Sequence, residues 1–138
     1  MPTVRRGDAG DLSAIEAIQK ASPEAAQWSP AEYLQYDLLV AVRGLHVVAF
    51  FVVRTLAPGE REILNWAVTP EFRRQGIARA LWSALQEGFH GATYLEVRAS
   101  NLTALKFYKS VGFEELTVRP GYYQNSSEPA IVMKFHSC

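Results

Sequence analysis

The stretch Glu60 to Val68, EREILNWAV, is followed by Thr69-Pro70 and the basic turn Arg73-Arg74-Gln75-Gly76. Its apolar and β-branched residues predict a strand. Beyond the turn, apolar residues recur at helical spacing: Ala78, Leu81, Trp82, Leu85 and Phe89. A strand, a glycine-containing turn and a helix can form an anion site, because the first N–H groups of a helix are unpaired and its N-terminus carries positive partial charge. From the residues alone, however, such a turn is more often a solvated helix entrance.

Toward the N-terminus, the pattern predicts two helices and three further strands. The strands are expected at Thr3 to Arg6, Leu38 to Arg43 and His46 to Leu56. One helix carries Leu12, Ile15 and Ile18 on one face after the capping residues Asp8 and Asp11, and a short one begins at Ser29-Pro30. The three strands from Leu38 to Val68 are separated by glycine-containing turns and predict an antiparallel meander.

Toward the C-terminus, strands are predicted at Thr93 to Arg98, Glu114 to Arg119 and Ala130 to Phe135, with a helix capped by Asn101 after the first of them. The order is therefore β-α-α-β-β-β-α-β-α-β-β. This order predicts an α+β fold in which helices flank a mixed, mostly antiparallel central sheet, formed by one domain over residues 1–138.

Composition excludes several functions. The 14 basic and 14 acidic side chains cancel, so there is no overall electrostatic attraction to nucleic acid or membranes, and any contact with a polyanion must come from a local cluster. Cys138 has no cysteine partner and the three histidines have no metal-ligand spacing, so we expect neither a disulfide nor a metal. No apolar run could cross a bilayer, and we expect a cytoplasmic protein.

Two motifs resemble those of the general N-acetyltransferase (GNAT) superfamily. Arg73-Arg74-Gln75-Gly76-Ile77-Ala78 is similar to the pyrophosphate motif Q/R-x-x-G-x-G/A, and Leu95 to Asn101, LEVRASN, is similar to the second signature of N-terminal acetyltransferases. Within the superfamily, the chain most resembles the RimI-type enzymes, which acetylate the N-terminal alanine of a small-subunit ribosomal protein. The last motif position is Ala78 where glycine is common, and Trp66 replaces a small apolar residue.

The resemblance implies acetyl-CoA as cosubstrate and assigns Glu96 as general base, through water, and Tyr108 as the acid that protonates the thiolate. From the residues alone, Glu96 is either a base of raised pKa or a solvent-facing strand residue. By its helical spacing alone, Tyr108 is more often a core aromatic than an acid. Asn101 is near the cofactor in the family, although a helix cap is the simpler interpretation.

The remaining expected site residues hold the two substrates. The resemblance implies that the cofactor contacts the main chain at Ala67 and Val68 and the motif residues Arg73, Arg74, Gln75, Gly76, Ile77 and Ala78. Trp28, Tyr122 and Tyr123, in or beside predicted loops, either contact an acceptor peptide or close the ends of the core.

We therefore expect transfer of an acetyl group to the α-amino group of a protein N-terminus, by a monomer or weak dimer whose partner is an N-terminal peptide, possibly of a small-subunit ribosomal protein. Three alternatives stay open: an acetyltransferase for a small-molecule amine, a non-catalytic acyl-CoA sensor, and a module that binds nucleotide phosphates.

Overall fold

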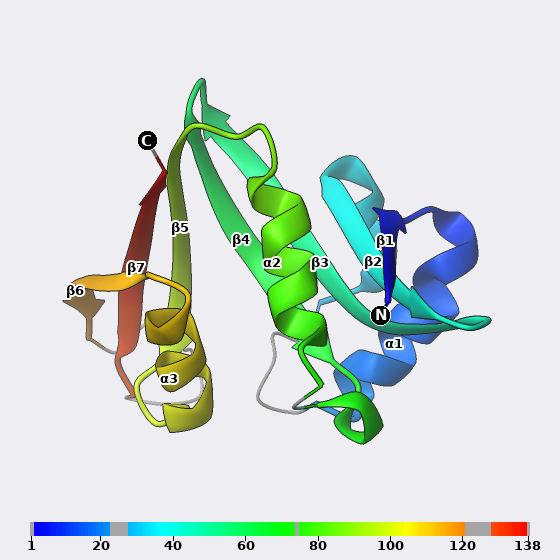
Figure 1. Cartoon of the computed structure of the whole chain (residues 1–138). Helices are drawn as coiled ribbons and strands as arrows, with labels where there is room; N and C mark the ends of the chain where they lie inside the picture. Colours follow the sequence, from blue (N-terminus) through cyan, green and yellow to red (C-terminus); the bar gives the residue numbers. More distant parts are fainter. Residues whose placement is uncertain (1, 23–27, 74, 121–127, 138) are drawn as a thin grey trace. The chain divides into compact units, whose positions relative to one another are not determined.

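The structure, a computed structural model, describes residues 2–22, 28–73, 75–120 and 128–137. The strands are β1 (Thr3–Arg6), β2 (Asp37–Arg43), β3 (His46–Ala57), β4 (Glu60–Val68), β5 (Gly91–Arg98), β6 (Glu114–Arg119) and β7 (Ala130–Ser137). The α-helices are α1 (Leu12–Lys20), α2 (Ile77–Gln86) and α3 (Leu102–Ser110), and short 3₁₀ helices are η1 (Ala9–Asp11), η2 (Pro30–Gln35) and η3 (Pro70–Phe72). Figure 1 shows this order in colour.

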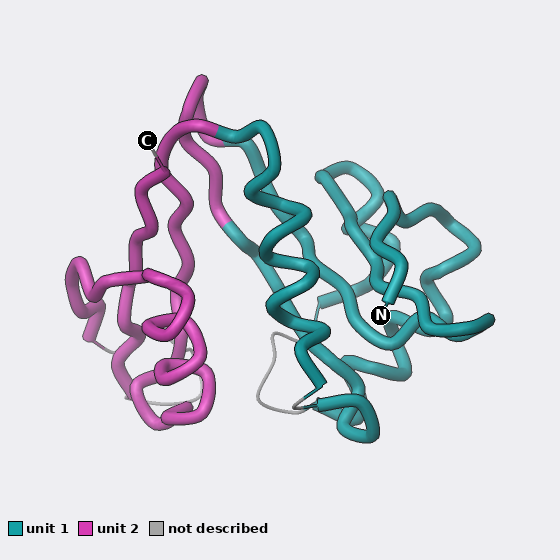
Figure 2. The backbone as a smooth tube through the Cα atoms, in the orientation of Figure 1, with its two compact units in different colours: residues 1–55, 63–89 teal, residues 56–62, 90–138 magenta. Residues whose placement is uncertain are grey.

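The strands hydrogen-bond in the order β1-β2-β3-β4-β5-β7-β6, and their described pairings are antiparallel except for β4 with β5. This confirms the predicted mixed, mostly antiparallel sheet. The chain divides into two compact units, Met1–Thr55 with Ile63–Phe89, and Leu56–Glu62 with His90–Cys138 (Figure 2). We call them the first and second units. The single domain over 1–138 stays a prediction.

In the first unit, helices cover both faces of the strands. Consecutive residues of β3 point to opposite faces. The ring of Phe50 lies 5.9 Å from that of Tyr33 in η2, whereas Phe51 lies 4.2 Å from Trp66, which is stacked on Trp82 of α2. The helix α1 packs on the η2 side through Ile15 and Ile18, in a core cluster with Tyr33, Leu38, Val40, Phe50, Val52 and Ala67.

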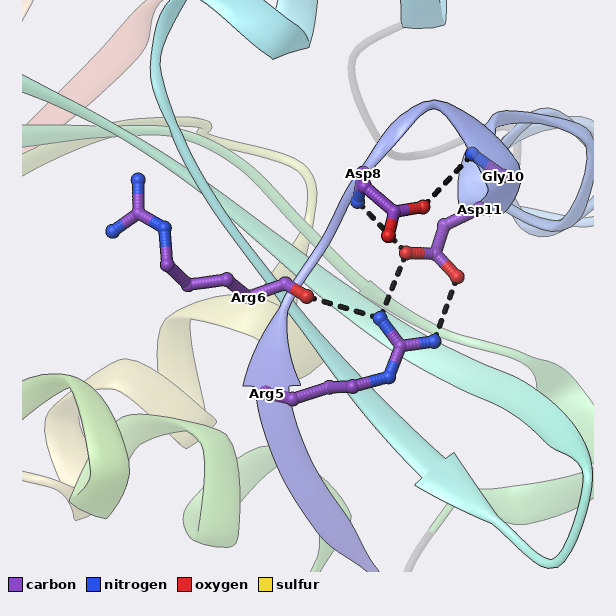
Figure 3. Close-up of polar contacts among 5 residues, drawn as sticks. All are labelled: Arg5, Arg6, Asp8, Gly10 and Asp11. Atoms are coloured by element: carbon purple, nitrogen blue, oxygen red, sulfur yellow. Dashed lines mark hydrogen bonds and ion pairs between the residues drawn. The ribbon is translucent and has the colours of Figure 1, made fainter.

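A polar cluster links β1 to η1, the 3₁₀ turn that leads into α1, whose own N-cap residue Asp11 makes no side-chain cap hydrogen bond (Figure 3). Asp8 and Asp11 form a capping box, in which Asp8 accepts from the Gly10 N–H and Asp11 from the Asp8 N–H, both at 2.9 Å. Arg5 donates to both carboxylate oxygens of the buried Asp11 at 2.9 Å. This hydrogen-bonded cation lowers the pKa of Asp11.

In the second unit, β5 pairs with β7 along its whole length, and β6 lies at the sheet edge with all six residues exposed. Residues 60–62 pair in parallel with Ala92–Tyr94. Gly91, at φ +146°, lies against Gly59, whose carbonyl oxygen would be 2.1 Å from an added Cβ. Only a residue without a side chain allows this approach of two backbones.

The predicted order of helices and strands is confirmed, with one difference in type. The second helix begins at Pro30, as predicted, but it is 3₁₀ rather than α, and Ser29 occupies its N-cap position without a side-chain hydrogen bond. A segment of six residues is short enough for the tighter winding, which is common in short connecting pieces.

Candidate active site

The predicted phosphate cradle begins where β4 ends. Gly76 is the N-cap of α2 at φ +80°, in the left-handed region that favours glycine. A Cβ there would meet no atom of the described residues within 4 Å, so among these residues it is the backbone conformation that calls for glycine. The first described helical bond runs from Ala80 N–H to the Gly76 carbonyl, which leaves the N–H groups of Ile77 and Ala78 without an acceptor inside the helix. Such a turn suits a pyrophosphate.

The side chains of the motif hold the turn itself. Arg73 donates from Nε to the carbonyl of Val68 at 3.0 Å and from Nη2 to Ser22 Oγ at 2.8 Å. Two predicted cofactor residues, Arg73 and Val68, are thus brought together. Their bond ties the turn to the end of β4, so a phosphate role for the Arg73 side chain stays a prediction.

Gln75 is held by a residue that the sequence analysis missed. Arg43, at the end of β2, donates to Gln75 Oε1 at 2.6 Å and lies over the Phe72 ring, with 5.8 Å from Cζ to the centroid. Gln75 Nε2 also reaches the carbonyl of Glu71 at 3.4 Å. An exposed cation is therefore fixed beside the turn, 32 positions away in sequence. Arg74 is outside the described residues.

Successive side chains at the end of β4 point to opposite faces of the strand. Ala67 is buried on the α1 side of the strand, within the core cluster that contains Tyr33. Trp66 points the other way, between the rings of Phe51 and Trp82. The indole that replaces the family's small residue therefore packs in the core of the first unit. Just after Val68, the Thr69 N–H donates to the carbonyl of Val48 at 2.8 Å.

Glu96 lies in β5 on the face opposite to the buried Leu95 and Val97, as its alternation predicts. Its side chain is only 17% exposed, and its carboxylate forms an ion pair with Arg119 of β6. No local sequence pattern indicates Arg119 as this partner, because the two residues are 23 positions apart on strands separated by β7. Within the second unit the candidate base is therefore partly enclosed and faces a cation.

Tyr108 lies in α3, where Asn101 accepts from the Ala104 N–H at 3.2 Å and confirms the predicted helix cap. The Tyr108 ring is 5.8 Å from that of Phe113, which is 5.7 Å from that of Phe135. Phe135 is the register partner of Thr93 in β5. Tyr108 is half-buried, so its position is compatible both with a role in aromatic packing and with a role as the acid.

The two candidate catalytic residues belong to different faces of the β5–β7 ladder. Thr93 shares its parity in β5 with Leu95 and Val97, so Phe135 and the rings that contact it lie on the face opposite to Glu96. Because the two side chains lie on opposite faces, this arrangement favours a separate role for each of them over a direct proton transfer between Glu96 and Tyr108.

Among the predicted acceptor residues, Trp28 is 40% exposed, and its ring is stacked 6.2 Å from that of Tyr33. Its main-chain carbonyl accepts a hydrogen bond from Gln19 Nε2 at 2.8 Å. The other two, Tyr122 and Tyr123, lie outside the described residues.

The described residues contain no group of three or more His, Cys, Asp or Glu side chains placed for a metal ion. Within the same part of the chain, no helix is long and apolar enough to span a membrane.

Comparison with known proteins identifies the family of the chain. Residues 11–113 match the Acetyltransferase (GNAT) family. The chain is 38% identical to the [ribosomal protein bS18]-alanine N-acetyltransferase of Escherichia coli K12 over 147 aligned residues, which cover 96% of each chain.

Solved structures give the same result. The crystal structure of the E. coli ribosomal-protein-S18-alanine N-acetyltransferase superposes with a TM-score of 0.83 at 31% identity, covering 100% of this chain and 96% of that one. Ard1 from Thermoplasma volcanium superposes with a TM-score of 0.89 at 28% identity, covering 99% and 98%. The chain is an N-acetyltransferase and belongs to the GNAT family.

Proposed function

We propose that this protein transfers the acetyl group of acetyl-CoA to the α-amino group of an N-terminal alanine on a ribosomal protein in the cytoplasm. The observation that carries the proposal is the match along nearly the whole chain to an enzyme named for that acceptor. The glycine turn of the first unit and the Glu96 and Tyr108 positions of the second supply groups suited to this chemistry.

Acetyl-CoA supplies an activated thioester, and the chain offers main-chain groups to hold it. The N–H groups at the start of α2, exposed by the left-handed Gly76, suit its pyrophosphate. Main-chain groups at Ala67 and Val68 are our candidates for the pantetheine arm and for polarising the acetyl carbonyl. Arg73, through its bond to the Val68 carbonyl, supports both elements.

The second unit offers the proton-transfer groups. As the amine nitrogen bonds to the acetyl carbon and the carbon–sulfur bond breaks, the amine loses a proton and the thiolate needs one. We assign the first to the Glu96 carboxylate through water and the second to the Tyr108 phenol. A phenol is protonated at neutral pH and can donate to a developing thiolate.

The α-amine is the better acceptor for a single carboxylate base. With ordinary pKa values near 8 and 10.4, making the amine neutral at pH 7 costs about 1 kcal/mol for an N-terminus and more than about 4 kcal/mol for lysine. The exposed Trp28 indole is our candidate wall for the first residues of the acceptor.

The test is coenzyme A release from acetyl-CoA with three peptides: one that begins with the free alanine of bS18, the same peptide blocked at its α-amine but carrying a lysine, and one with a different first residue. We expect turnover with the first alone. Turnover with the blocked peptide would move the acceptor to lysine. No turnover with any peptide, despite acetyl-CoA binding, would favour a small amine or a sensor.

A further inference from the structure

Three buried polar side chains of the first unit have no part in the roles assigned above. Gln19 of α1, Tyr33 of η2 and Asn65 of β4 are 4%, 0% and 6% exposed. We call them the Gln19 network. Asn65 Nδ2 lies 3.0 Å from both Gln19 Oε1 and the Tyr33 hydroxyl, and that hydroxyl donates to Gln19 Oε1.

The network runs from one main-chain group to another. At one end, Asn65 Oδ1 accepts from the Trp66 N–H at 2.9 Å, next to the β4 residues proposed to hold the acetyl group. At the other end, Gln19 Nε2 donates to the Trp28 carbonyl at 2.8 Å. A backbone N–H can only donate and a carbonyl can only accept, so these two ends fix which way each amide points.

Burial makes the arrangement specific. Buried polar groups are costly unless they are hydrogen-bonded, and apolar side chains of the same volume are often at least as stabilising. Burial also raises the pKa of Tyr33, and its hydroxyl, like any phenol at neutral pH, is protonated and can donate. Hydrogen bonds, unlike apolar packing, give the main-chain groups that they bind a defined position.

That main chain belongs to Trp28, whose indole is 40% exposed. The Tyr33 ring stacks on it at 6.2 Å and is braced by Phe50 at 5.9 Å. Gln19 and Tyr33 thus contact the carbonyl and the ring of Trp28, the residue that we place at the acceptor peptide. Through Asn65 they connect Trp28 to β4.

We infer that Gln19, Tyr33 and Asn65 are positioning residues for the acceptor: they hold Trp28 at a fixed place relative to the β4 main chain. This inference rests on the proposed function, because it takes Trp28 as a wall of the acceptor site. Its signature is a change in acceptor KM without a matching change in the KM of acetyl-CoA or in kcat, since the network includes neither the glycine turn nor Glu96 or Tyr108.

The test compares Gln19→Met with Ile18→Val at the neighbouring buried position of α1. At similar volume, Gln19→Met removes the hydrogen bonds of Gln19 with the Trp28 carbonyl, the Tyr33 hydroxyl and Asn65 Nδ2. Gln19→Met should raise the KM of the alanine peptide about ten-fold, with kcat and the KM of acetyl-CoA within about two-fold. Ile18→Val should leave all three within two-fold. An unchanged peptide KM, or equal changes for both substrates, would overturn the inference.

Tyr33→Phe is a second test of the network, which still applies if Gln19→Met does not fold. It removes the hydroxyl and keeps the ring that stacks on Trp28 and Phe50. We expect about a three-fold rise in peptide KM, and no rise would count against the network.

Hydrogen exchange separates this inference from the proposed function. Amides of residues 28–36 should exchange several-fold faster in Gln19→Met than in the wild type or in Ile18→Val. If the wild type does not acetylate the alanine peptide, the proposed function fails, and the exchange rates still decide: equal rates would show that the network does not position Trp28.

Discussion

The glycine turn before α2 and the Glu96 position on β5 offer two different kinds of chemical group. At the turn, the groups suited to the cofactor are main-chain N–H groups, and the Arg73 and Gln75 side chains hold the loop. On β5, the candidate group is a carboxylate, already paired with Arg119. The turn should therefore be sensitive to backbone conformation and affect binding, whereas Glu96 should be sensitive to side-chain chemistry and affect turnover.

The largest expected effect is that of Glu96→Gln. Without its base, the enzyme should lose on the order of 100-fold in kcat at pH 7, and most of the loss should be recovered at high pH, where the α-amine is neutral without help. The measurement is kcat against pH with the alanine peptide.

Arg119→Gln is the matched control for that variant, because it breaks the same ion pair and keeps the carboxylate. We expect a loss of only a few-fold, in line with the small energies of partly exposed pairs. Equal losses in both variants would assign the effect to the pair and take the base role from Glu96.

Tyr108→Phe should come next, with a loss on the order of ten-fold in kcat. Phenylalanine preserves the ring that packs 5.8 Å from Phe113, so folding should be retained. Calorimetric titration should give the same acetyl-CoA affinity for variant and wild type. A fall in melting temperature with no kinetic change would instead identify Tyr108 as a packing residue only.

On the other side of the comparison, Gly76→Ala should raise the KM of acetyl-CoA about ten-fold with little change in kcat. A residue with a side chain is strained by about 1–2 kcal/mol at φ +80°. We expect the backbone to relieve this strain by shifting, which displaces the first N–H groups of α2. Gly88→Ala is the matched control, since Gly88 has φ +74° and no described atom near an added Cβ either, but lies beyond the opposite end of α2. Similar KM values for the two variants would remove the cradle role.

The smallest effect on catalysis is expected from Asp11→Asn, which should change stability alone. Losing a buried, charge-assisted partner of Arg5 should lower the free energy of unfolding by about 1–3 kcal/mol at pH 7. The folded pKa of Asp11 is lowered, so its contribution is present above the ordinary value near 4 and disappears as the pH falls through the folded value.

Urea melts of wild type and Asp11→Asn, run from pH 7 down to about pH 2, would check this. The two stabilities should converge toward low pH. A constant difference would show that the ion pair is not its source.

The sequence predicted the strand and helix order because local patterns determine it. The alternation around Glu96 and the Asn101 cap both proved correct in the structure. The 3₁₀ form of η2 was not predictable, because six residues are too few to distinguish a period of 3.0 from one of 3.6.

Side-chain partners were beyond the reach of the sequence. Asn65 lies 46 positions from Gln19 and 32 from Tyr33, so no local pattern marks the Gln19 network. Arg73, identified only as a phosphate cation, also holds Ser22, 51 positions away. Such pairs are determined by the packing of distant elements, which periodicity does not reveal.

The exposed edge strand β6 has a consequence for handling the protein. An edge presents backbone groups that can pair with another chain, and β6 adds the exposed apolar side chains of Leu116 and Val118. The charges of Glu114, Glu115 and Arg119 flank them and act as gatekeepers against intermolecular β-pairing. Surface engineering that neutralises these three residues, for crystallisation or labelling, would turn β6 into a template for aggregation.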